Sequence, residues 1–118
     1  MMARIGNDRM ITHGEQREDN SWLFTVCYTA YFSDDELGQR FDDLVIIREL
    51  RGQRIAGAEQ AVTFTATSPR VFRKKRIVVH QNSIESMCAL IRLQRVQSEA
   101  VDDEQRTPAL VSRQSVRC

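Results

Sequence analysis

The sequence predicts a mainly β domain, a small sandwich or barrel of five to six strands. Several segments alternate apolar and polar residues with a period of two and are rich in β-branched and aromatic side chains. Polar connections with Gly, Pro, Asp and Ser separate them. At 118 residues and 42% hydrophobic content, the chain has the size of one domain with one core. An α+β alternative, with helices near 34–42 and 84–97, also fits the spacing of apolar residues there.

Two segments carry the clearest strand pattern. In 21–32, SWLFTVCYTAYF, apolar residues, most of them large, occupy every second position from Trp22 to Phe32, and the other face is only partly polar. In 61–67, AVTFTAT, small and large apolar residues alternate with threonines. Ser68 and Pro69 then end the second strand, because proline lacks the donor that a sheet needs.

The remaining elements are assigned from composition and breaks. We expect strands over 43–50, 75–81, 87–95 and 109–116, joined by loops that include 51–60 and 97–108. Ser33 and Glu36 form an S-x-x-E capping box, which indicates a helical turn before the second strand. Residues 1–20 are polar and are predicted to be a flexible arm preceding a single domain over 21–118. The candidate core residues are Phe24, Val26, Val45, Ile47, Val62, Phe64, Val79, Ile91 and Leu93.

The charges are unevenly distributed, although the net charge is only +1. Acidic residues prevail over residues 1–47 and basic residues over 48–76, by five and six charges respectively. The remaining segment is balanced. Such a distribution permits acidic and basic faces on one molecule, and therefore head-to-tail contact between copies.

Sequence motifs typical of catalysis are missing. The sequence contains no nucleotide-binding glycine motif, no serine-hydrolase elbow and no zinc-protease motif. Neither His13 nor His80 has a partner at informative spacing, although His80 could serve as a base for Cys27 or Cys88 if the fold joined them. We therefore expect no enzymatic activity, no catalytic residues and no cofactor.

Three further features bear on location. The longest apolar runs are far below the roughly 20 residues that span a bilayer, so no membrane association is expected. The N-terminal segment lacks the apolar stretch of a signal peptide. The odd set of cysteines, Cys27, Cys88 and Cys118, has no regular spacing and fits buried or free thiols better than a disulfide framework. These features predict a cytoplasmic location.

The apolar strand 21–32 predicts an interaction domain without chemistry of its own. It holds more large side chains than a lone solvent-facing strand would carry, so a partner protein, including another copy of the chain, could cover its second face. A strand buried on both faces within one chain would explain the same pattern. The predicted partner-binding residues are Trp22, Tyr28, Tyr31 and Phe32.

The segment 70–76, RVFRKKR, is the basis of an alternative function. Its basic side chains could pair with phosphates and Phe72 could stack on a base, as in β domains that bind single-stranded nucleic acid. The near-neutral net charge and the lack of an aromatic RNA-binding motif speak against this, and charges at a strand edge also prevent aggregation. The residues of this alternative are Arg70, Phe72, Arg73, Lys74, Lys75 and Arg76.

The acidic clusters suggest a second alternative, a calcium-binding sandwich. Loop carboxylates can supply the oxygen ligands that calcium requires, but none of these clusters matches the EF-hand spacing. Solvated acidic loops explain them equally well, so no metal site is assigned. The carboxylates of this alternative are Asp34, Asp35, Asp42, Asp102 and Asp103.

Overall fold

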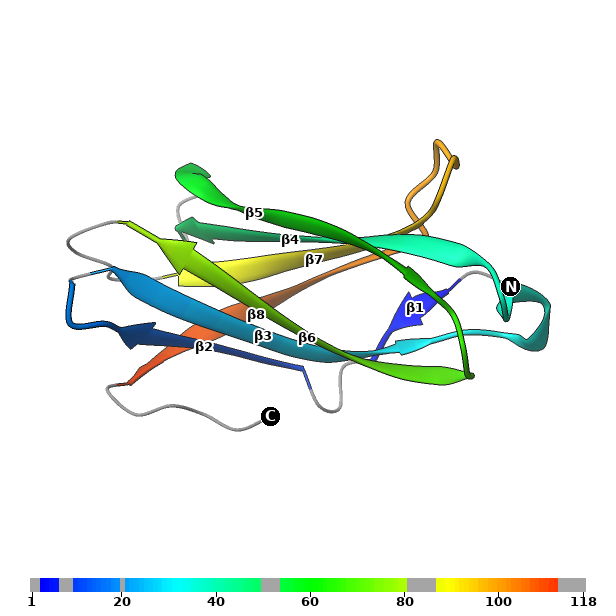
Figure 1. Cartoon of the computed structure of the whole chain (residues 1–118), viewed down its shortest axis with the longest axis horizontal. Helices are drawn as coiled ribbons and strands as arrows, with labels where there is room; N and C mark the ends of the chain where they lie inside the picture. The colour runs from blue at the N-terminus through cyan, green and yellow to red at the C-terminus, as the bar shows by residue number, and fades with distance from the viewer. Residues whose placement is uncertain (1–2, 7–9, 20, 50–53, 81–86, 113–118) are drawn as a thin grey trace.

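The computed structural model describes residues 3–6, 10–19, 21–49, 54–80 and 87–112 and confirms the mainly β prediction. Eight strands form two sheets that pack face to face as a sandwich of 45 × 28 × 20 Å (Figure 1). In the described part of the chain the helical content is one 3₁₀ turn over Asp34–Glu36, so the α+β alternative is wrong. No helix among these residues is long and apolar enough to cross a membrane. The strands are β1 (Arg4–Ile5), β2 (Ile11–Gln16), β3 (Trp22–Tyr31), β4 (Arg40–Glu49), β5 (Arg54–Thr65), β6 (Arg70–Val79), β7 (Met87–Arg95) and β8 (Asp103–Ser112).

The first sheet, sheet A, is built around β3. Strand β6 pairs antiparallel with one edge of β3 over its whole length, and β2 and β1 pair with successive parts of the other edge. The second sheet, sheet B, places β4 between β5 and β7, and the first half of β8 extends it beyond β7. Past Pro108, β8 leaves β7 and pairs in parallel with β2, so this strand joins the two sheets.

The core lies between the sheets and follows the alternation of the sequence. Inward-facing side chains of β3, including Phe24 and Val26, meet those of β4 and β7, including Val45 and Ile91, all fully buried. Seven of the nine predicted core residues are buried and Phe64 packs against the core in part. Val62 was predicted wrongly: it is 37% exposed, because β5 is an edge strand with an open flank.

Several boundaries differ from the sequence prediction. Strands β5 and β8 begin within segments expected to be loops, and β6 begins at Arg70. The first twenty residues, expected to form an arm, contain β1 and β2, and Ile5 is buried in the core. These polar segments form strands because their backbones pair with β3, although their composition does not predict strands. The part of the predicted last strand beyond residue 112 lies outside the described residues.

The capping box predicted at the start of segment 33–42 is present. The backbone N–H of Ser33 donates to Glu36 Oε1 at 2.9 Å, and its hydroxyl donates to the same oxygen at 2.8 Å. Glu36 is fully buried, and the other carboxylate oxygen lies 3.5 Å from Arg95 Nη2. The turn therefore connects β3 to β4 and fixes that end of the sandwich onto β7.

Candidate functional site

Strand β6 divides the basic segment between two faces of sheet A. Because successive side chains of a strand point to opposite sides, Arg73 and Lys75 turn inward with the core residues Ile77 and Val79. The exposed side chains point outward: Arg70, Phe72, Lys74, Arg76 and Val78. The segment predicted as one nucleic-acid surface thus forms two separate surfaces.

The inward pair meets Asp43 of β4 across the sandwich. Lys75 Nζ donates to Asp43 Oδ1 at 2.6 Å, and Arg73 Nε donates to Oδ2 at 2.9 Å. The hydroxyl of Tyr28, on β3, also donates to Oδ2, at 2.7 Å. We call these four residues the Asp43 cluster. They link β3 and β6 of sheet A to β4 of sheet B.

Burial and hydrogen bonding oppose each other in this cluster. Burial alone would raise the pKa of Asp43, but the hydrogen bonds from Arg73, Lys75 and Tyr28 hold it below its ordinary value. Burial lowers the pKa of Lys75, against the attraction of Asp43. Burial and the neighbouring carboxylate raise the pKa of Tyr28, so its hydroxyl stays protonated and acts as a donor.

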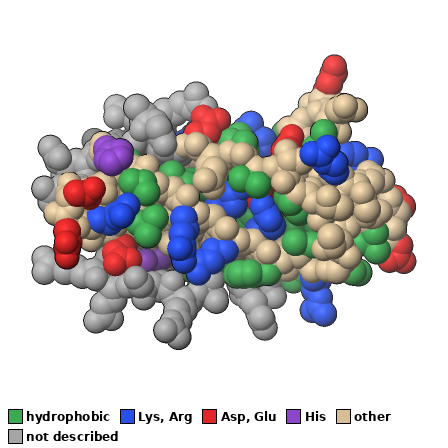
Figure 2. Space-filling model, in the orientation of Figure 1, with side chains coloured by type: hydrophobic (Ala, Val, Ile, Leu, Met, Phe, Trp, Pro, Cys, Tyr) green, Lys and Arg blue, Asp and Glu red, His purple; other side chains and the backbone are tan. Residues whose placement is uncertain are grey.

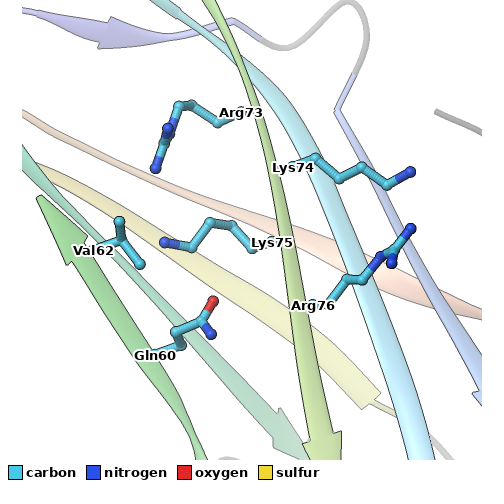
Figure 3. Close-up of a pocket in the computed structure, with 6 residues that line it drawn as sticks. All are labelled: Gln60, Val62, Arg73, Lys74, Lys75 and Arg76. Atoms are coloured by element: carbon cyan, nitrogen blue, oxygen red, sulfur yellow. The ribbon is translucent and has the colours of Figure 1, made fainter. Parts of the chain in front are cut away.

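An open groove runs over the cluster, between the edge strands β5 and β6. It has a volume of about 450 Å³ and is lined by Gln60, Val62, Arg73, Lys74, Lys75 and Arg76. Figure 3 shows Arg73 and Lys75 reaching from β6 toward β5, whereas Lys74 and Arg76 point the opposite way. The groove exists because β5 and β6 end their sheets and do not pair with each other along this stretch.

The phenyl ring of Phe64 supports one wall of this groove. The guanidinium carbon of Arg73 lies 4.2 Å from its centroid, a distance at which a cation is attracted to the ring face. Phe64 in turn contacts the rings of Phe32 and Phe41. Arg73 is therefore positioned both by a carboxylate and by an aromatic cluster.

The outer face of sheet A forms the second candidate surface. Phe72 is 53% exposed and Val78 is 37% exposed. The cations of β6 alternate with them, and blue side chains cross the middle of this view of the molecule (Figure 2). On β3, Tyr31 lies opposite Arg70 and carries Arg4 over its ring at 4.9 Å. The face thus combines aromatic and basic groups.

The predicted partner-binding residues lie mainly in the core. Tyr28 is fully buried, and Trp22 and Phe32 are each only 7% exposed. Tyr31, on the opposite face of β3, is partly exposed. The chain itself covers the first three, so the apolar face of β3 no longer argues for a partner.

The carboxylates of the calcium alternative are spread over four places. Asp34 and Asp35 belong to the 3₁₀ turn, Asp42 accepts a hydrogen bond from Thr63 on the outer side of β4, and Asp103 accepts one from the backbone N–H of Ile5 at 2.7 Å. Burial raises the pKa of Asp102, in the β7–β8 connection. Within the described ranges, the structure gathers no group of three potential metal ligands.

The histidines and cysteines are also separated. His80 is exposed at the end of β6, whereas Cys27 pairs with Lys74, six positions away along that strand. Cys27 is disulfide-bonded and Cys88 is free. The expectation of free thiols is therefore corrected for Cys27, and Cys118 lies outside the described residues.

The sequence prediction missed Asp43 and the wall formed by Gln60 and Val62. A signal was available for Asp43, because Phe41, Val45 and Ile47 share its parity along β4 and are all buried. Parity with Ile77 likewise places Lys75 and Arg73 inward. The juxtaposition of β5 and β6 depends on how the two sheets pack, for which the sequence carries no local signal.

Comparison with known proteins supports the fold. No family model and no curated protein matches the sequence. Among solved structures, the chain is similar to a putative beta-galactosidase from Bacteroides fragilis, with a TM-score of 0.72 and 12% identity over 90% of this chain and 17% of that one. It is also similar to a beta-glucuronidase from glycoside hydrolase family 2, with a TM-score of 0.60 and 13% identity over 90% of this chain and 12% of that one.

These two similarities are consistent with a small β-sandwich fold. The chain spans less than a fifth of either enzyme, about the size of one β-sandwich domain within a larger protein. At such low identity the similarity shows the fold alone and transfers no site residue.

Proposed function

We propose that the chain is a non-enzymatic β-sandwich that binds a protein, including another copy of itself, through the outer face of sheet A. The observation that carries this proposal is the exposure of Phe72 and Val78 among the cations of β6. Exposed apolar side chains beside arginines are typical of the centre of protein interfaces.

Charge complementarity supports self-association. One end of the sandwich, the end at which β6 begins, exposes acidic residues of two neighbouring connections, Asp34 and Asp35 after β3 and Glu99 after β7. A basic face on one copy and an acidic end on the next would form a head-to-tail contact. Such a contact weakens as salt screens the charges.

Sedimentation velocity at low and high salt tests this proposal. The wild-type chain should associate at low salt, and association should weaken when Phe72→Ala and Lys74→Glu are combined. Arg106→Glu, a charge reversal on an exposed residue of β8, is the matched control and should associate like wild type. A monomer at high concentration and low salt would refute self-association, and pull-down with acidic proteins would then test a different partner.

Single-stranded nucleic acid is a second candidate for the same face, because Phe72 shares it with Arg70, Lys74 and Arg76. Stacking on an exposed ring contributes about 1–3 kcal/mol per base, and the cations would pair with phosphates. Binding of a fluorescent oligonucleotide should therefore fall steeply with salt and fall again in Phe72→Ala. Absence of binding at low salt would remove this candidate.

The cytoplasmic location stays a prediction. The disulfide-bonded state of Cys27 counts against it, because such bonds persist mainly in oxidising compartments. Mass spectrometry of the alkylated protein, purified without reductant, measures how much of Cys27 is oxidised.

A further inference from the structure

The groove between β5 and β6 carries an unbalanced charge. Arg73 and Lys75 contribute two positive charges at its floor, and Asp43 is the carboxylate that pairs with them in the described part of the chain. The side chains of Lys75 and Asp43 are 2% and 0% exposed and that of Arg73 is 20% exposed, so the cluster meets water mainly at Arg73. Among the described residues, two cations of the cluster thus share one carboxylate.

The same residues retain hydrogen-bond donors. Lys75 Nζ and Arg73 Nε each donate one hydrogen bond to Asp43, and because Lys75 carries three N–H donors and Arg73 five, both residues can donate further hydrogen bonds. The carboxamide of Gln60 stands on the facing wall (Figure 3). Because Asp43 and Phe64 hold Arg73 in place, these donors are positioned before any ligand arrives.

We propose that this groove is a binding site for an oxyanion, a carboxylate or phosphate group carried by a small molecule. The guanidinium of Arg73 presents paired donors that match such a group, and Lys75 contributes a point charge beside it. Gln60 completes the contact from β5. An anion here would balance the charge of the Asp43 cluster and join the free edges of the two sheets.

The size of the groove indicates more than a simple ion. A volume of about 450 Å³ lies in the range of small-molecule sites, about 300–1,000 Å³. Val62, 37% exposed on the β5 wall, offers an apolar surface for the body of the ligand. Lys74 and Arg76 also line the groove, but their side chains point toward the outer face of sheet A (Figure 3), so the two proposals depend on side chains on opposite faces of β6.

Calorimetric titration with inorganic phosphate and with succinate, at constant ionic strength against sodium chloride, tests the site. We expect one-to-one binding that Arg73→Gln weakens about tenfold or more, as loss of a charge-assisted hydrogen bond should. Arg92→Gln also removes one positive charge, on a strand of sheet B, and should bind like wild type. The preference between the two probes distinguishes a phosphate site from a carboxylate site.

Chemical-shift mapping of the wild-type chain keeps the proposal testable if the substituted chains fail to fold. Phosphate should shift the backbone amide signals of Gln60, Val62 and residues 73–76. No binding beyond that of chloride, undiminished binding by Arg73→Gln, or shifts confined to Arg70, Phe72 and Val78 would each overturn the proposal.

Discussion

At the scale of single residues, Asp43 connects the two sheets through its side chain. One carboxylate accepts hydrogen bonds from three residues, of which Tyr28 and Lys75 are themselves buried. A buried ion pair does not by itself indicate high stability, because both ions lose their hydration on folding. Removing only one partner, however, leaves a buried charge without compensation.

We therefore expect Asp43→Asn to reduce the free energy of unfolding by about 3–5 kcal/mol, as measured by urea denaturation at neutral pH. The amide keeps the size of the side chain but cannot neutralise Lys75. Asp42→Asn, on the outer side of the same strand, is the control and should cost little. Equal effects of the two substitutions would show that the Asp43 cluster does not stabilise the fold.

The pKa of Asp43 also predicts how stability depends on pH. Its folded-state pKa is lowered from 3.8, so Asp43 binds a proton more readily when the chain is unfolded. Its contribution is thus complete above about pH 5, roughly one unit above its unfolded pKa, and is lost as the pH falls through its folded pKa. Of the residues that face it, Tyr28 and Lys75 keep their protons in acid, and Arg73 carries the remaining donor. The unfolding energy of Asp43→Asn should therefore fall less between pH 5 and pH 2 than that of wild type, and parallel curves would contradict this.

At the scale of elements, β2 shows why backbone pairing can override composition. Gly14 lies opposite Phe24 on β3, and a Cβ atom placed on it would lie 2.7 Å from the phenyl ring. Phe24 is fully buried, so the ring has little room to move. The polar strand reaches β3 because this glycine leaves space for the aromatic ring.

Gly14→Ala should accordingly destabilise the chain by about 1–3 kcal/mol, the usual cost of overpacking a core. Its midpoint in urea measures the effect. Combining it with Phe24→Leu should cost less than the sum of the two single changes, because the smaller side chain frees the space that the added methyl group needs. Strict additivity would indicate that the glycine is required for another reason.

The alternation of apolar residues decides which elements could be predicted. It places β3 and β7 to within one or two residues, and the antiparallel pairing of β7 with β4 excludes a helix there. The beginnings of β5 and β8 have no such alternation and depend on pairing with β4 and β7. Arg73 and Lys75 of β6 point inward because they alternate along the strand in step with the core residue Ile77. Their charge alone would predict that they are exposed. Inward charges on an edge strand also hinder pairing with other chains.

At the scale of the whole molecule, folding divides the basic segment of the sequence between two faces of sheet A, so only part of its charge is available to a partner. The basic segment provides two inward charges, held by Asp43, and three outward ones on sheet A. The acidic residues 34 and 35 lie at the end of the sandwich, after β3. The proposed association between copies therefore depends on Arg70, Lys74 and Arg76, rather than on all charges of the segment.

The parallel pairing of β2 with β8 brings residues 12–15 beside residues 109–112. During synthesis, β2 can find β3 early, since only a few residues separate them, but its other edge stays unpaired until the end of β8 has been made. Non-local pairings of this kind are closed late, and domains dominated by them fold in about milliseconds to seconds. A chain whose synthesis stopped at Pro108 would keep the antiparallel pairs of β8 with β7 and lack its bridge to sheet A. Such a truncated product would present a bare edge of β2, open to the β8 of another chain.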